Sequence, residues 1–119
     1  MGQSRYYEFC GGCHGLSGVS ARQHIPVLKG EVGRFLCTAE GRKYIARLPN
    51  VAFAAMDDQT LAETMNFMVF TLGQDSAPKG AAPYTAREIG QLRKSPLKAT
   101  DLVSMRRHIL DAPSKSCPA

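Results

Sequence analysis

Apolar residues recur along this chain at the three- and four-residue spacing of amphipathic helices, which predicts an all-α fold. The clearest stripe lies between residues 59 and 72, and its apolar members are Leu61, Met65, Met68, Val69 and Leu72. Asp57 and Asp58 stand just before this stripe as candidate N-caps, and Gly73 follows it. The pattern therefore predicts one continuous helix over residues 59–72.

Shorter helical patterns lie on both sides of this stripe. Ser4 is a candidate N-cap for a helix that runs to Phe9, and Thr85 with Glu88 three residues later has the spacing of a capping box. The helix after Thr85 is expected to present Tyr84, Ile89 and Leu92 to the body. Further helices are expected at residues 31–36, 41–48 (closed by Pro49 and Asn50) and 100–110, with loops at 15–30 and 74–83.

Length and composition indicate a single globular domain over residues 1–119. Hydrophobic residues make up 44% of the chain and charged residues 21%, which argues against wholesale disorder. No apolar run approaches the roughly 20 residues that cross a bilayer, so no membrane span is predicted. No basic-then-apolar leader is visible either, so we expect a cytosolic protein or a chain that lacks its leader.

The sharpest motif is Cys10-Gly11-Gly12-Cys13-His14, the spacing of covalent haem c attachment. Two thiols three residues apart reach the two vinyl groups at one porphyrin edge and form thioethers. The residue that follows directs its imidazole onto the iron as the proximal ligand. The motif therefore predicts one covalently bound haem c, held by Cys10, Cys13 and His14.

Two other site types use paired cysteines. A structural zinc site needs four soft ligands, usually from two such pairs, but Cys37 and Cys117 stand singly. A thioredoxin-like dithiol needs a strand before the motif and a helix after it, but a Gly-rich loop follows here. The sequence favours haem attachment over both alternatives.

The chain resembles the class I c-type cytochromes over residues 5–72. An aromatic-rich helix at residues 6–9 leads into the attachment motif and Gly15, and residues 26–30 (Pro-Val-Leu-Lys-Gly) look like the family's Pro-x-Leu-x-Gly segment. Residues 56–67 resemble its closing helix, which packs across the N-terminal one. The resemblance implies an all-α cytochrome c-like fold of about five short helices around one covalent haem. The core would span about residues 4–72, and residues 73–119 would form a helical extension.

The same resemblance assigns roles to two residues after the motif. The carbonyl of Pro26 would accept a hydrogen bond from the His14 Nδ1, and Leu28 would cover the proximal face of the haem. A carbonyl acceptor makes the imidazole more electron-rich and fixes its orientation.

The sixth iron ligand is expected to be a methionine, as in most haem c electron carriers. Met68 lies in an Asn-aromatic-Met-apolar run similar to that of a subgroup of small bacterial haem proteins, and is our first candidate. Met56 precedes the closing helix but abuts its cap, and Met65 lies on a stripe where methionine often fills the core. The remaining alternatives are Met105, His24, His108 and an open sixth site.

Haem c is attached outside the bacterial cytoplasm, so the resemblance implies a periplasmic protein whose leader is absent from this chain. An oxidising compartment allows Cys37 and Cys117 to form a disulfide; two buried thiols are the alternative. The predicted function is a monomeric monohaem cytochrome, not an enzyme, that carries single electrons between periplasmic redox partners. It would serve a dehydrogenase as carrier or subunit and pass electrons towards a terminal acceptor. The competing hypothesis is a haem-based gas sensor or haem enzyme with a labile or open sixth site.

The formal net charge is +5, and residues 87–107 carry six basic residues against two acidic ones. Such charge can steer a diffusing carrier onto a redox partner with an acidic docking surface. No base-reading motif accompanies it, so nucleic-acid binding is not predicted.

Overall fold

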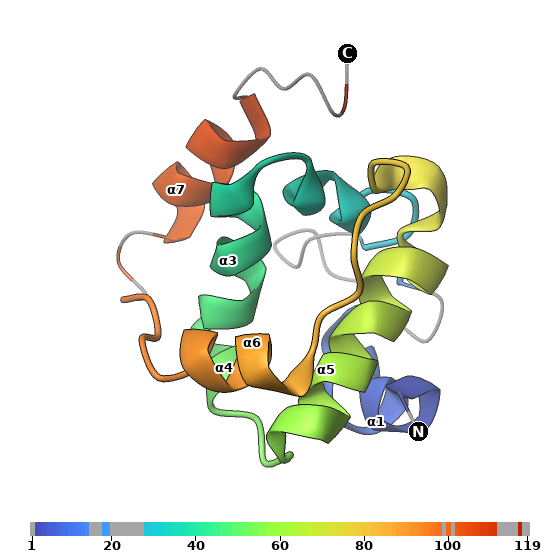
Figure 1. Ribbon diagram of the computed structural model, residues 1–119, viewed down its shortest axis with the longest axis vertical. Coiled ribbons are helices and arrows are strands. Elements are labelled where there is room, and N and C mark those ends of the chain that lie inside the picture. The colour runs from blue at the N-terminus through green and yellow to red at the C-terminus, as the bar shows by residue number, and fades with distance from the viewer. Residues whose placement is uncertain are drawn as a thin grey trace.

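The computed structural model describes residues 2–14, 18–19, 28–98, 100, 102–111 and 117. Within these residues every regular element is helical, which confirms the all-α prediction. In chain order (Figure 1) the elements are α1 (Gly2–Phe9), α2 (Gly11–His14), the 3-10 helix η1 (Val32–Cys37), α3 (Ala39–Arg47), α4 (Pro49–Ala52), α5 (Asp58–Asn66), the π-helical segment η2 (Phe67–Leu72), the 3-10 turn η3 (Gln74–Ser76), α6 (Ala86–Leu92) and α7 (Leu102–Asp111).

Helix α5 packs across α1, as expected for a closing helix. The two backbones approach at Gly2, where a Cβ atom would overlap the carbonyl oxygen of Glu63. One turn further on, the fully buried ring of Tyr6 lies 5.5 Å from the ring of Phe67. The crossing of α1 and α5 is therefore fixed at two contacts. Gly2 lets the backbones approach, and the Tyr6–Phe67 pair packs one turn further on.

The two helices predicted at 31–36 and 41–48 are present with shifted bounds and a different geometry. The first is the 3-10 helix η1, and the second, α3, begins two residues earlier than expected. Thr38 explains both shifts, because its extended backbone (φ −131°, ψ 154°) ends η1 while its hydroxyl accepts a hydrogen bond from the Gly41 N–H at 3.0 Å. Phe35 of η1 then stacks on Tyr44 of α3, with ring centroids 5.5 Å apart.

The prediction of a helix over residues 59–72 is confirmed in extent, but the winding changes from α to π in its second half. Asp57 caps α5 as predicted, accepting a hydrogen bond from the Thr60 N–H at 2.7 Å. After Asn66 the chain winds more widely as η2, and the Gly73 N–H donates to the carbonyl of Met68, five residues back, at 2.9 Å. The π-helical winding shifts later residues around the axis, which the apolar spacing did not reveal.

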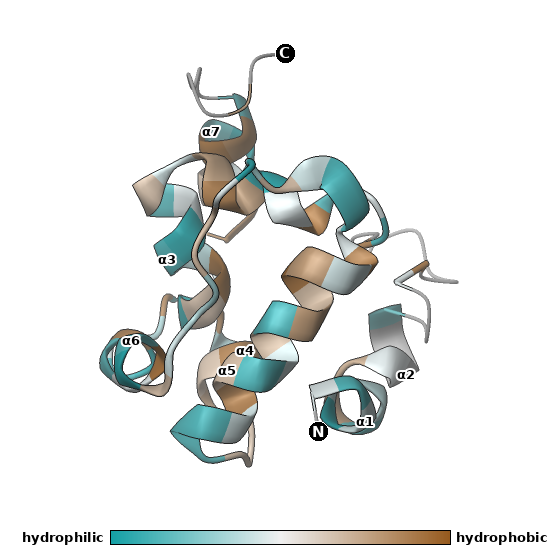
Figure 2. Ribbon diagram, turned by 45° about the vertical axis from the view of Figure 1, so that its right-hand side comes forward, coloured by the Kyte–Doolittle hydropathy of each residue, from teal (hydrophilic) through white to brown (hydrophobic). Residues whose placement is uncertain are grey.

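Residues 73–98 of the extension belong to the same core as the preceding helices. Ile89 of α6 is fully buried and Tyr84 is 3% exposed, and both lie in one cluster with residues of α1, α3 and α5. Figure 2 shows α6 end-on with its hydrophobic side towards α5. The predicted capping box is half correct: Thr85 accepts from the Glu88 N–H at 3.2 Å, but the Glu88 carboxylate instead pairs with Arg42.

Two helix ends differ from expectation. Helix α1 begins at Gly2, so Ser4 lies inside it and is not its N-cap. Pro49 does not close the third helical segment but starts α4, at the first position where a missing N–H costs no hydrogen bond.

Helix α7 packs against α3 and corresponds to the helix predicted at 100–110. The Tyr44 hydroxyl donates to the carbonyl of Leu102 at 2.9 Å, and Ile109 is buried against the surface where Gly41 lies. No helix among the residues described is long and apolar enough to cross a membrane.

Candidate functional site

The attachment motif lies on a helical path that continues from α1 into α2. The Cys10 N–H donates to the Tyr6 carbonyl at 2.8 Å, and the His14 N–H donates to the Cys10 carbonyl at 3.0 Å. Four-residue hydrogen bonds of this kind keep positions 10, 13 and 14 on one side of the helix. Cys10 and His14 are both half-buried, and the side chain of Cys13 lies outside what the structure describes.

Tyr6 is fully buried and lies one helical turn before Cys10. Burial, together with the smaller electrostatic effects of the nearby Cys10 and Tyr7, raises the pKa of its phenol to about 12. The phenol is therefore uncharged at neutral pH. Cys10 packs against the core cluster that contains this ring.

Of the segment at residues 26–30 that was predicted to cover the proximal face, the structure describes residues 28–30. Pro26 and the alternative ligand His24 lie outside the described residues. Leu28 is 7% exposed and belongs to the core cluster, and its N–H donates to the Gly18 carbonyl at 2.7 Å. Gly18 has φ +84°, and a Cβ there would come within 2.9 Å of the Lys29 nitrogen, so this contact requires glycine.

Met68 is the second residue of η2 and is 8% exposed. The carbonyl of Leu72, at the end of this segment, accepts a hydrogen bond from the Gly30 N–H at 2.8 Å. The Gly33 N–H donates to the Ser76 hydroxyl at 2.9 Å, and that hydroxyl donates to the Gly73 carbonyl. The end of η2, the segment that carries Met68, is thereby joined by hydrogen bonds to residues 30–33.

Met56 lies in the loop ahead of α5 and is half-buried. Its sulfur is 3.5 Å from the Thr64 hydroxyl, which also lies 2.9 Å from the Thr60 carbonyl. A hydroxyl has one hydrogen, and the shorter distance places it on the carbonyl. The sulfur of Met56 therefore packs against α5 beside this hydroxyl.

Arg93 holds the loop that carries Met56. From the C-cap of α6 its guanidinium donates to three carbonyls, and it forms an ion pair with Asp58 at 3.1 Å. The acceptors and distances are Ala52 at 3.0 Å, Ala54 at 2.7 Å and Met56 at 2.8 Å. Sequence reasoning had counted Arg93 only as a surface charge, whereas its side chain is 16% exposed.

The remaining alternatives occupy varied environments. Met65 is 2% exposed in the core, Met105 is half-buried on α7, and His108 is exposed on the same helix. Within the described residues, no three His, Cys, Asp or Glu side chains gather as a metal site.

Cys37 and Cys117 are brought together. Their sulfur atoms lie 1.93 Å apart and their Cα atoms 5.6 Å apart. The pair joins the end of η1 to the segment beyond α7.

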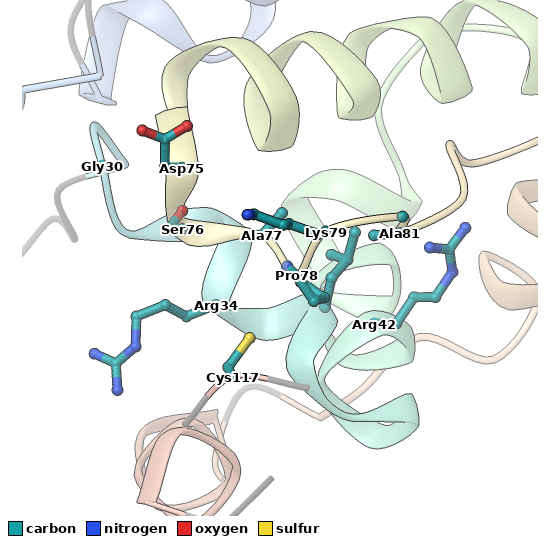
Figure 3. A pocket seen from close by; sticks show the side chains of 12 residues that line it. Gly30, Arg34, Arg42, Asp75, Ser76, Ala77, Pro78, Lys79, Ala81 and Cys117 are labelled. Carbon is teal, nitrogen blue, oxygen red and sulfur yellow. The ribbon is translucent and has the colours of Figure 1, made fainter. Parts of the chain in front are cut away.

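An open pocket of about 960 Å³ lies beside η1 and η3 (Figure 3). Its charged lining residues are Arg34, Arg42, Asp75 and Lys79. In Figure 3 the two arginines extend towards opposite sides of the pocket. Of the described residues predicted to hold haem, none lines this pocket, which is therefore distinct from the motif.

The residues around the motif fit haem c chemically. Positions 10, 13 and 14 lie on one side of a helical turn, and the side chains of Cys10 and His14 are half-buried, not sealed in the core. Cys10 is half-buried, which leaves its thiol accessible, and it packs against the core cluster that contains the buried Tyr6 ring.

Comparison with known proteins yields no matching family model. Two curated proteins from Thermus thermophilus, both named cytochrome c-552, are similar to this chain. Each is 24% identical over 124 aligned residues that cover 89% of the chain, and 95% and 84% of the two relatives respectively. This distant similarity over most of the length supports a c-type cytochrome with a cytochrome c-like all-α fold.

Proposed function

We propose that this chain is a monohaem class I c-type cytochrome that carries single electrons between periplasmic redox partners. The observation that carries the proposal is Cys10-Gly11-Gly12-Cys13-His14 on one helical turn. The similarity to cytochrome c-552 supports an electron carrier with covalently bound haem c and iron rather than an enzyme. We further propose that a dehydrogenase supplies the electrons and that they continue towards a terminal acceptor.

The chain's own residues divide the work of holding the cofactor. Cys10 and Cys13 would hold the haem through thioethers, His14 would bind the iron, Pro26 would orient the imidazole of His14, and Leu28 would cover the haem on that side. The bound haem supplies a reversible one-electron couple. The protein sets the potential through ligand identity, hydrogen bonding and burial.

Met68 is our proposed sixth ligand, with Met56 and then Met65 as runners-up. The support for Met68 is its place in an irregular helical segment and its burial among apolar side chains, since π-helical turns are common at functional sites. A thioether in an apolar setting raises the potential relative to a second imidazole.

Spectra of the haem-loaded protein test the assignment. The reduced-minus-oxidised spectrum is expected to show haem c, and the oxidised protein a weak near-infrared sulfur-to-iron band. Met68→Ala is expected to abolish this band, while Met56→Ala and Met65→Ala retain it. A band lost only in Met56→Ala would move the ligand to residue 56, and a wild type without any band would exclude methionine.

A gas sensor or haem enzyme is the second candidate function. It is favoured by the placement of Met56, the methionine ahead of the closing helix, because its sulfur packs against α5 beside the Thr64 hydroxyl. Carbon monoxide added to the reduced protein separates the two functions. Immediate binding supports the sensor or enzyme, and an unchanged spectrum supports the carrier.

We propose that the partners present acidic docking surfaces to a monomeric carrier. Arg93 contributes little to such docking, because its side chain is 16% exposed and its guanidinium pairs with Asp58. Arg106 keeps its charge but is half-buried, 5.8 Å over the Phe35 ring. The exposed cations of this region are Arg87, Lys94, Lys98 and Arg107. Electron transfer to an acidic partner is expected to slow steeply as salt rises.

The disulfide between Cys37 and Cys117 is likewise proposed, and is supported by the sulfur distance. In the chain-entropy model such a long loop gains about 3–5 kcal/mol from closure. Thiol titration of the unfolded, unreduced protein is expected to find neither sulfur reactive. Two reactive thiols would exclude the bridge.

A further inference from the structure

The π-helical segment η2 is held at both of its ends by groups from outside the helix. Isolated π-helical turns are rare because their hydrogen bonding is less favourable than that of the α-helix. A sequence that winds this way therefore needs further contacts to fix where the widening begins and ends. Asn66 stands at the beginning and Gly73 at the end.

Asn66 fixes the beginning through its side-chain amide. The amide NH2 donates to the Tyr84 carbonyl at 3.0 Å, and the amide oxygen accepts from the Tyr84 N–H at 2.7 Å. One side chain thus pairs with both polar groups of one distant residue, 18 positions along the chain. Two hydrogen bonds fix both the orientation of the Asn66 amide and its distance from the Tyr84 main chain.

Tyr84 is itself a firm anchor. Its hydroxyl donates to the Arg42 carbonyl at 2.6 Å, and the Arg42 guanidinium lies 4.3 Å over its ring. That guanidinium makes two bonds to Glu88, at 2.7 and 2.8 Å. The contact with Asn66 is therefore backed by α3 and α6 together.

We infer that Asn66 is a positioning residue for the sixth ligand: its paired hydrogen bonds to Tyr84 fix the start of the π-helical turn and so hold the Met68 sulfur in place. Ser76 supports the other end of the turn through the Gly73 carbonyl and the Gly33 N–H. The inference rests on the proposed assignment of Met68. It gives the extension a role at the haem site that neither the motif nor the similarity assigns.

The test uses the haem-loaded protein and the variant Asn66→Ala. We expect a weaker near-infrared band, and carbon monoxide binding to the reduced protein about tenfold faster, because both hydrogen bonds of the Asn66 amide are lost. In the Met68→Ala background the same substitution should leave the carbon monoxide rate unchanged. If Asn66→Ala does not load haem, Ser76→Ala provides the milder test in the same direction.

Arg93→Gln is the matched control, because it also weakens the extension but acts on the loop at residues 52–58. It should lower the midpoint of thermal unfolding without changing the band or the carbon monoxide rate. If Asn66→Ala lowers the midpoint in the same way and leaves both spectroscopic readouts unchanged, Asn66 is only a structural anchor and the inference fails. If Met68→Ala itself keeps the band, the ligand assignment fails instead.

Discussion

The two segments that carry the leading methionine candidates are both braced by the extension, but by different chemistry. The loop at residues 52–58 is held by one cation, Arg93, which binds three carbonyls and a carboxylate. The π-helical segment is held by neutral groups, the amide of Asn66 and the hydroxyl of Ser76. A loop has few internal hydrogen bonds and needs several donors, whereas a helical turn needs only its ends fixed.

Ile89→Ala should have the largest effect, because both braces depend on the seating of α6. The side chain is fully buried, so its truncation leaves a cavity and is expected to cost about 3–4 kcal/mol in the free energy of unfolding, measured with urea. Val103→Ala, at a position 75% exposed, is the control and should change little. A cost for Ile89→Ala below about 1 kcal/mol would mean that the extension is not part of the core.

Arg93→Ala tests only the contacts through which the Arg93 guanidinium holds the loop at residues 52–58. The change removes all four contacts of the guanidinium and leaves three carbonyls to water, so we expect a loss of about 2–3 kcal/mol in the same experiment. The neighbouring exposed Lys94→Ala should stay within about 0.5 kcal/mol of the parent. Equal effects at the two positions would contradict the brace.

Tyr84→Phe tests how firmly Tyr84, the residue that pairs with the Asn66 amide, is held. It removes only the hydroxyl bond to the Arg42 carbonyl and should cost about 1 kcal/mol, since the ring and its main-chain pairing with Asn66 remain. Burial raises the pKa of Tyr84, so its contribution is present below pH 10 and is lost as the pH rises through the higher folded value. The unfolding energy of Tyr84→Phe should therefore fall less steeply in alkali than that of the parent.

Asp57→Ser should have the smallest effect at neutral pH, because serine also caps helices. Hydrogen bonds from the Thr60 main chain and side chain lower the pKa of Asp57 below its ordinary value of 3.8. Its contribution is thus present above pH 3.8 and is lost as the pH falls through the lower folded value. Thermal midpoints between about pH 4 and pH 2 should decline less in Asp57→Ser; identical declines would rule out a titrating cap.

The sequence predicted the features that depend on near neighbours. The caps at Asp57 and Thr85 need only a partner three residues away, and the haem motif needs five consecutive residues. The hydrogen bonds of Arg93 and Asn66 were not predicted, because their partners lie 18 to 41 residues away and no local sequence pattern indicates such contacts. A signal for Asn66 existed, since its amide begins the Asn-aromatic-Met run that singled out Met68.

The helix geometry after residue 66 was missed for a different reason. Apolar spacing reports an average period, and a single wider turn alters it too little to be seen in fourteen residues. The end of η1 was missed because Thr38 serves two helices at once. For Cys37 and Cys117, a disulfide was predicted because an oxidising compartment allows one, and only the structure shows that the two sulfur atoms lie close together.

The crossing of α1 and α5 has a consequence for how the chain assembles. Gly2 and Tyr6 find their partners Glu63 and Phe67 only about sixty residues later, a separation that makes this contact slow to form. Until residues 63–67 have joined the fold, α1 lacks both of these contacts. In a newly made chain the crossing, and with it the contact that buries Tyr6, therefore waits on a segment about sixty residues downstream.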